Sequence, residues 1–210
     1  METSNYTQYF VSDSWRKFRQ GDYEMLGEIF HNLYKELYYY GLKLVSIPDL
    51  VKDTIQDVFV DVWSRRQNMN EVNNIKAYLL VSIRRELLRR IEKLRKENSF
   101  EDSSIEPFIF STEDFIVKEE TDLLTTQALV QSLGKLTERQ REVILLRFNH
   151  ELDFQDLAVI MDMNTQSVRN LLFRALNNIR KYMKDSGIEG VTDIEVFLLT
   201  IFQKINLNIS

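Results

Sequence analysis

The chain has 210 residues and a mass of 25.0 kDa, which suits one domain or two small helical ones and is too short for a large multidomain enzyme. Its 44% hydrophobic and 28% charged residues are typical of a folded globular protein, although the net charge of −5 is unusual for a nucleic-acid binder. Because cysteine is absent and only His31 and His150 are present, disulfides, thiolate metal sites and a zinc cluster are excluded. The six glycines form no phosphate-binding motif, so the usual signature of a nucleotide-driven enzyme is missing.

The first residues and the apolar runs of the sequence argue against export and membrane insertion. The opening segment METSNYTQYF contains no basic stretch followed by an apolar one, so we expect no signal peptide. The longest apolar runs, such as Val196 to Phe202, are far shorter than the roughly 20 residues that cross a bilayer. We therefore expect a cytoplasmic protein that does not insert into a membrane.

Apolar residues recur at helical spacing through nearly the whole chain, which predicts an all-α protein of two helical domains. The first long helix is expected from about Asp22 to Val45, where Ser46-Ile47-Pro48 ends the pattern. Asp49 is expected to cap the next helix, which carries one apolar face. After an Asn-rich loop, a third helix is expected from about Asn74 to Glu97.

The middle of the chain is acidic. Residues 97–120 carry eight Asp or Glu and one Lys, and they separate two locally basic segments, Arg84–Lys96 and Met163–Lys184. No sustained period is present there, but Phe100, Phe108 and Phe110 interrupt the polar composition. We therefore predict a first domain at 1–97, an acidic linker at 98–121 that lies across another surface, and a second domain at 122–186.

The second domain carries the signals of a helix-turn-helix. Thr137 and Gln140 fit a capping box that opens a helix through Arg147. Asp153 is expected to cap a short helix over 154–161, and a tight turn at 162–164 leads into a helix from Thr165 to about 183. An ordinary three-helix bundle with a basic solvated face is the alternative. The absence of any acid from 163 to 184 favours DNA, because solvated faces usually mix both signs of charge.

The tail at 187–210 is strongly apolar. Asp193 could cap a short helix with an apolar stripe of Ile194, Phe197, Leu198, Ile201 and Ile205. So much apolar surface must be buried. Packing against the second domain is the simplest solution, and an antagonist protein or self-association are the alternatives.

Segments in both halves of the sequence resemble the two-domain bacterial sigma-70-type sigma factors of the extracytoplasmic-function group. In the second half the similar segments are LTERQREVILLRF from Leu136, FQDLA from Phe154, and the Ser167-Val-Arg and Arg174-Ala-Leu stretches. In the first half they are FRQGD from Phe18 and the D-x-x-Q-D-V-F pattern from Asp53, with Trp63. The third helix departs from the family, since an Arg occupies the position where Asn is usual; we therefore infer a strand-separation role there but no base contact at Arg85.

The resemblance implies a detachable specificity subunit of RNA polymerase that catalyses no reaction and needs no cofactor. Its implied partners are core RNA polymerase and promoter DNA, and an anti-sigma factor is a further candidate. The family reads the −35 promoter element with its second domain, which here assigns Thr165, Gln166, Ser167, Arg169, Asn170, Phe173 and Arg174. It binds the −10 element with its first domain, which assigns Arg65, Asn68, Asn70, Asn74, Arg84, Arg85, Arg89 and Lys93. Its clamp contact falls on the second helix, at Asp53, Gln56, Asp57 and Val60.

The chemistry of each set agrees with these roles. Amides in the Asn-rich loop suit an unstacked base, basic residues along the third helix suit phosphates, and an exposed acidic stripe suits a basic protein partner. Each also has a plainer interpretation as a solvated helix face or a simple connection. The rival function is a helix-turn-helix regulator that acts without polymerase. A helical hydrolase is a third, for which the sequence offers no convergent catalytic set.

Overall fold

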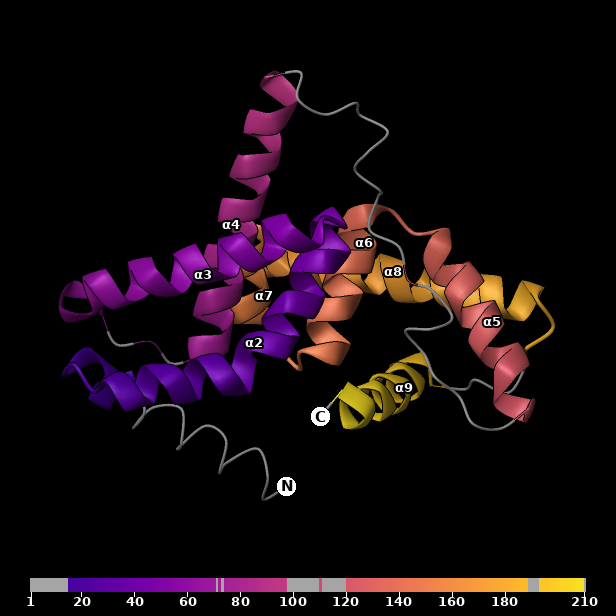
Figure 1. The fold of residues 1–210 in the computed structure, drawn as a ribbon. Coiled ribbons are helices and arrows are strands. Elements are labelled where there is room, and N and C mark those ends of the chain that lie inside the picture. Colours follow the sequence, from indigo (N-terminus) through magenta and orange to yellow (C-terminus); the bar gives the residue numbers. More distant parts are fainter. Residues whose placement is uncertain are drawn as a thin grey trace. The chain divides into compact units, whose positions relative to one another are not determined.

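The computed structural model describes residues 15–70, 72, 74–97, 110, 120–188 and 193–209, with the side chains of 120–123 and 204–209 left out. Within these residues the chain is helical and contains no strand, which confirms the predicted all-α class. By its contacts the fold divides into two packed units, Met1–Glu106 and Pro107–Ser210. Figure 1 labels the helices of both. In the described part of the chain, no helix has the length and apolarity needed to span a membrane.

Three long helices form the first unit: α2 (Tyr23–Val45), α3 (Pro48–Arg65) and α4 (Ile75–Lys96), each packed against the other two. A short 3₁₀ turn, η1 (Arg66–Asn68), follows α3. The prediction that Asp49 caps α3 is wrong. The cap position is Ile47 and the helix begins at Pro48, two residues earlier than an Asp49 cap implies, because proline is favoured at the first helical position, where its missing N–H costs no hydrogen bond.

Gly41 lets α2 approach the other two helices closely. A Cβ atom at this position would lie 2.6 Å from Val51 Cγ1 of α3 and 3.4 Å from Leu87 Cδ1 of α4. The contact with Val51 is shorter than packed carbon atoms tolerate, whereas that with Leu87 is an ordinary van der Waals distance. The absence of a side chain at this point is therefore a requirement of the three-helix packing.

A helical turn at residues 15–19 joins the first unit through aromatic side chains. Trp15 and Phe18 are buried, and their rings stack with centroids 4.9 Å apart. Phe18 contacts Trp63 of α3, and Trp15 contacts Tyr78 of α4, both at 5.8 Å between centroids. This aromatic cluster ties the N-terminal turn to the two helices that flank the Asn-rich loop.

The second unit contains α5 (Glu120–Gly134), α6 (Glu138–Ile144), a π-helical turn η4 (Leu145–Asn149), α7 (Phe154–Met161), α8 (Thr165–Asp185) and α9 (Ile194–Ile209). The long helix α8 packs against α5, α6, α7 and α9. The capping box at Thr137 and Gln140 is confirmed, with both reciprocal hydrogen bonds present. Asp153 caps α7 as predicted, accepting hydrogen bonds from the backbone of Gln155 and Asp156 at 2.8 Å.

The α-helix predicted through Arg147 ends at Ile144 and continues as the wide turn η4. The residues from Arg141 to Leu146 are all buried, so this segment is enclosed by neighbouring helices rather than amphipathic. A π turn carries one more residue than an α turn, and its hydrogen bond runs here from the His150 N–H to the Leu145 carbonyl at 3.2 Å.

The apolar tail forms α9 and packs against α8 and η4, as the simplest interpretation of its sequence predicted. The Asp193 carboxylate caps it, accepting from the backbone of Glu195 at 2.9 Å. Ile194, Leu198 and Phe202 are fully buried, at helical spacings of four residues. The tail is therefore part of the second unit.

Candidate nucleic-acid and protein interfaces

The second unit presents α8 through a tight turn. Asp162 ends α7 in the left-handed conformation, with φ 53°, and the Met163 N–H donates to the Ala158 carbonyl at 3.0 Å. Asn164 then caps α8 by accepting from the Ser167 N–H at 2.8 Å. These bonds determine the direction in which α8 leaves α7, so the pair has the geometry of a helix-turn-helix.

The predicted −35 residues lie together on the first turns of α8. Five of the seven are exposed and Thr165 and Ser167 are half-buried; the exposed ones are Gln166, Arg169, Asn170, Phe173 and Arg174. Phe173 is 66% exposed, which is high for an aromatic side chain. The Gln166 amide donates to the Asn170 side-chain oxygen at 3.2 Å, so these two side chains are oriented together. The face combines two arginines, two amides and an aromatic ring, which is the chemistry that base edges and phosphates require.

Phe154 links the two helices of this motif, a role that the sequence did not suggest. The Arg169 guanidinium lies 5.0 Å from the centroid of the Phe154 ring, and that of Arg147 lies 5.2 Å from it. Arg147 is itself held by donating to the Leu152 carbonyl at 2.7 Å. The Phe154 ring therefore restricts the side chain of Arg169 through cation–π contact. The only available signal was the aromatic residue at the first position of the short helix.

Arg141 has a structural role in the same unit. It is 7% exposed and donates to the carbonyls of Gly134 at 3.3 Å and Leu136 at 2.8 Å. Burial lowers the pKa of its guanidinium from the ordinary value. These bonds fix the turn between α5 and α6, and they place this arginine away from the exposed face of α8.

The four loop residues of the predicted −10 set have different surroundings. Arg65 ends α3 and forms an ion pair with Asp61, one turn earlier. Asn68 and Asn70 are exposed, and the Asn70 carbonyl accepts a hydrogen bond from the Trp15 indole at 3.4 Å. Asn74 caps α4 by accepting from the Ala77 N–H at 3.1 Å. The structure therefore leaves the side chains of Asn68 and Asn70 most accessible to a ligand.

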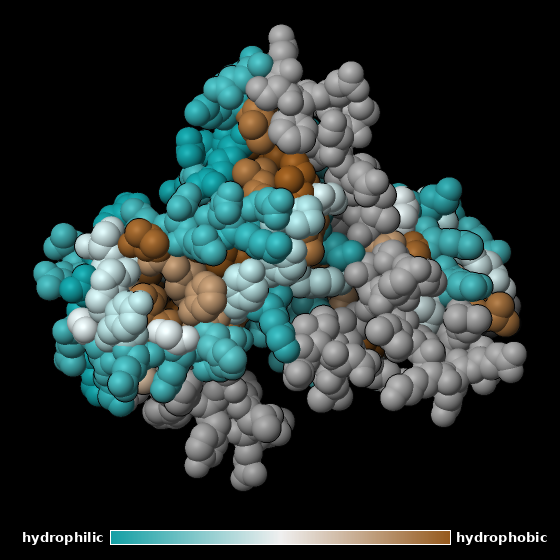
Figure 2. Space-filling view, viewed as in Figure 1, coloured by the Kyte–Doolittle hydropathy of each residue, from teal (hydrophilic) through white to brown (hydrophobic). Residues whose placement is uncertain are grey.

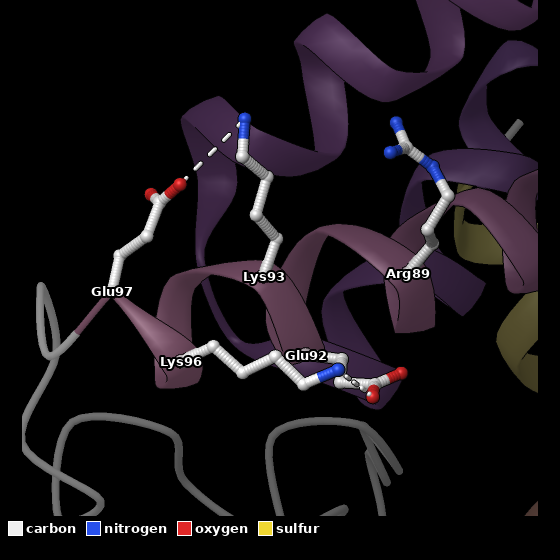
Figure 3. Close-up of a pocket in the computed structure, with 5 residues that line it drawn as sticks. All are labelled: Arg89, Glu92, Lys93, Lys96 and Glu97. Atoms are coloured by element: carbon white, nitrogen blue, oxygen red, sulfur yellow. Dashed lines mark ion pairs between the residues drawn. The ribbon is translucent and has the colours of Figure 1, made fainter.

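The four basic residues on α4 form the second part of that set. Arg85, Arg89 and Lys93 are exposed and Arg84 is half-buried. Figure 2 shows hydrophilic side chains along one side of the projecting part of α4 and hydrophobic ones along the other. Lys93 pairs with Glu97 at 3.8 Å, and in Figure 3 Arg89 and Lys93 project to the same side of the helix. A shallow hollow of about 380 Å³ is lined there by Arg89, Glu92, Lys93, Lys96 and Glu97.

Glu86 organises the arginines of α4. It accepts hydrogen bonds from Arg89 at 2.6 and 2.8 Å and from Arg90 at 2.7 Å. These bonds, led by that from Arg89, lower the pKa of the Glu86 carboxyl to about 2. The part of α4 with the most positive charge is thus also its most ion-paired part.

The two parts of the −10 set do not form one compact site. At a rise of 1.5 Å per residue, Arg89 and Lys93 lie about 22 and 28 Å along α4 from Asn74. The loop and the basic stripe can contact a single ligand only if that ligand runs along the helix. An extended nucleic-acid strand has this shape.

The predicted core-binding stripe lies on one exposed side of α3. Asp53, Gln56, Asp57 and Val60 are all exposed, and Val60 is 68% exposed. Asp57 is joined to α4 by an ion pair with Arg90 at 2.5 Å. The sequence did not reveal this pair, because its partners are far apart in the chain. The stripe combines carboxylates, an amide and an exposed aliphatic side chain, which suits a protein partner with a basic surface.

Two family models match the chain, one on each unit. The model described as "Sigma-70 region 2" matches residues 29–97, and the model described as "Sigma-70, region 4" matches residues 126–179. Together they cover more than half of the chain. The first includes α3 and α4 with their exposed sets, and the second includes α7 and α8 as far as Ile179.

Curated proteins and solved structures show the same likeness. The chain is 25% identical to RNA polymerase sigma factor SigV of Bacillus subtilis (strain 168), over 70% of this chain and 83% of that protein. It is 26% identical to ECF RNA polymerase sigma factor SigX of the same bacterium, over 77% and 84%. The fold is similar to that of the sigma factor RpoE from Bartonella quintana, solved in complex with the anti-sigma factor NepR (TM-score 0.56, 22% identity, 75% and 96% covered). It is also similar to CnrH in complex with the cytosolic domain of CnrY (TM-score 0.53, 15% identity, 83% and 97% covered).

Proposed function

Because this chain belongs to the sigma-70 family of RNA polymerase sigma factors, in the extracytoplasmic-function group, we propose that it binds core RNA polymerase and directs it to a promoter with two elements. One observation carries the proposal: each family match falls on a separately packed helical unit that exposes its own candidate contact surface. One surface is on α8, and the others are on α3, α4 and the loop between them.

The second unit is proposed to read the −35 element with α8. The helix is capped and exposed at its N-terminal turns, which is the part of a recognition helix that reaches base edges in the major groove. Arg169, Asn170 and Arg174 are the side chains with suitable donors, and Phe173 offers an apolar contact.

The first unit is proposed to bind the −10 element and to help separate its strands. Asn68 and Asn70 offer amides to an unstacked base, and the basic side chains of α4 follow the phosphate backbone. Trp15 of the aromatic cluster donates a hydrogen bond from its indole to the Asn70 carbonyl at 3.4 Å, which holds this part of the loop.

The stripe Asp53, Gln56, Asp57 and Val60 on α3 is proposed as the contact with core polymerase. Its exposure and its acidic character support this assignment. An anti-sigma factor is a further proposed partner, because the similar structure of the sigma factor RpoE is described as a complex with the anti-sigma factor NepR.

Binding of core RNA polymerase is the experiment that separates this function from its rival. The full chain should form a complex with core enzyme at nanomolar to micromolar concentration, and Asp53→Lys should weaken it about tenfold or more, the effect of reversing one charge at a complementary interface. Glu28→Lys on α2 makes the same charge change at another exposed acid and serves as the control.

Asp57 needs a second control because of its ion pair with Arg90. Arg90→Gln removes the pair but keeps the carboxylate, so retained polymerase binding in that variant combined with a loss in Asp57→Lys assigns the effect to Asp57 itself. A chain that binds a DNA operator tightly but never binds core polymerase would instead be a helix-turn-helix regulator, and the proposed function would be wrong.

A further inference from the structure

The C-terminal helix α9 lies outside both family matches, since the second of these ends at residue 179. It nevertheless has a complete buried face, made of Ile194, Leu198 and Phe202 at 0% exposure. This face packs against η4 and α8. The opposite side of the helix is exposed and includes Glu195, Val196 and Thr200.

One aromatic residue from the middle of the chain contacts this helix. Phe110 is 2% exposed, and its ring meets the Phe202 ring edge to face, with centroids 5.9 Å apart and planes at 64°. By its contacts Phe110 belongs to the second packed unit, although in the sequence it lies ten residues before the start of α5. The ring is therefore held by the unit that follows it in the chain.

We propose that α9 is a docking surface for Phe110, and that this contact limits the separation of the two units. With Phe110 docked, the covalent connection between them runs only from Glu97 to Phe110. That length of chain spans at most about 45 Å, at roughly 3.5 Å per residue. Without docking the connection runs from Glu97 to Glu120 and spans up to about 80 Å.

Burial of the Phe110 ring is favourable enough to hold the docked state. Full burial of one Phe side chain favours the docked state by about 10- to 100-fold. An edge-to-face aromatic pair adds to this preference. We therefore expect the docked state to predominate in the free chain, with Phe202 of α9 as one of the side chains that cover the ring.

The consequence for promoter binding rests on the proposed function. If the two units bind two DNA elements, a shorter connection restricts how far apart those elements can lie and raises the effective concentration of one unit near the other. The docking itself is a property of the free chain, so its test needs neither polymerase nor DNA and can fail independently of the proposed function.

The absence of cysteine makes a direct distance measurement practical. A donor and an acceptor dye are attached at Glu97→Cys and Lys135→Cys, exposed positions in the first and second unit, and energy transfer is recorded for single molecules of the full chain. Phe110→Ala and Phe202→Ala are expected to add a population at longer distances, since the reach of the connection grows about 1.8-fold. Val196→Ala, which truncates a 58% exposed side chain of the same helix, is expected to match the parent protein.

Phe110→Ala is the decisive variant, because Phe110 lies outside every described helix and its truncation leaves α9 intact. Unchanged circular dichroism together with the longer-distance population supports the proposal. Energy transfer in Phe110→Ala that is identical to that of the parent protein overturns it. A change that appears only in Phe202→Ala also overturns it, since that result reflects loss of the helix rather than of the contact.

Discussion

Phe154 is the residue that best shows how packing prepares a side chain for recognition. Its ring lies within 5.2 Å of the guanidinium groups of both Arg147 and Arg169, and of these two arginines only Arg169 is exposed. We expect Phe154→Leu to release Arg169 and to weaken binding of a selected −35 duplex by about 1 kcal/mol, the value of an exposed cation–π contact. Binding to a scrambled duplex should change less, because phosphate contacts do not need this orientation.

The measurement is a titration of both duplexes by the chain in complex with core polymerase. Phe154→Tyr keeps an aromatic ring and is expected to bind both duplexes as the parent protein does. Equal weakening for both duplexes in Phe154→Leu would mean that the ring only stabilises the fold, and Arg169 would then have no special orientation to lose.

Glu86 gives a second prediction at this scale, through pH. Its carboxyl has a pKa of about 2 in the folded protein against an ordinary 4.5, so the stability it contributes is present above about pH 4.5 and is lost as the pH falls towards 2. At pH 7 we expect Glu86→Gln to reduce the free energy of unfolding by about 1 kcal/mol, after allowance for screening by solvent. Denaturant unfolding from pH 7 to pH 2.5 measures the difference.

The difference between the parent protein and Glu86→Gln should stay constant from pH 7 to about pH 4.5 and shrink as the pH falls further towards 2.5. Glu92→Gln, which removes an acid paired with Lys96 at the exposed end of α4, should have a smaller effect at every pH. A difference between the parent protein and Glu86→Gln that is the same at pH 7 and pH 2.5 would contradict the role assigned to the ion pairs of Glu86.

At the scale of elements, two glycines of α2 are expected to respond in opposite ways to the same substitution. Gly41→Ala places a methyl group 2.6 Å from Val51 and should destabilise the first unit by about 1–3 kcal/mol, the usual cost of overpacking. A Cβ at Gly27 meets nothing within 4 Å, so Gly27→Ala should stabilise the helix by about 0.5–1 kcal/mol.

Thermal unfolding of the two variants measures both effects, since a change of 1 kcal/mol shifts the melting temperature by several degrees. An equal gain in stability at both positions would show that α2 and α3 pack less closely around Gly41 than the structure shows.

The elements themselves were largely predictable, because their signals are local. Asp153 and Asp193 cap the helices for which the sequence proposed them, and apolar spacing gave the correct face of α3. The start of α3 was misplaced because Asp49 and Pro48 are both good helix-start residues, and proline is favoured at the first helical position. The π turn was missed because a segment buried on all sides has no periodic signal to reveal its width.

The contacts that connect elements were not predictable from one sequence. The Asp57–Arg90 pair, the Phe154–Arg169 contact and the Phe110–Phe202 contact join residues that are 15 or more positions apart. Their existence depends on how helices pack, which local composition does not specify. The candidate contact residues themselves were found from a family resemblance and from exposed polar spacing, so their roles remain predictions.

At the scale of the whole molecule, the proposed function requires two units that act on one promoter. Each unit has its own core and its own candidate contact surface, so each is expected to be necessary and neither sufficient. A variant that is defective in α8 should still bind core polymerase through α3, and a variant that is defective in α3 should retain the −35 surface.

Transcription in vitro tests the central claim most directly. Core RNA polymerase from the organism that encodes the chain is mixed with a library of promoter fragments, with and without the full chain, and the 5′ ends of the transcripts are sequenced. The predicted result is a set of transcripts that require the chain and start at defined positions downstream of one shared two-element motif. These transcripts should be lost with Asp53→Lys and reduced with Arg169→Ala. Core enzyme that gives the same transcripts with and without the chain would contradict its assignment as a promoter-recognition subunit.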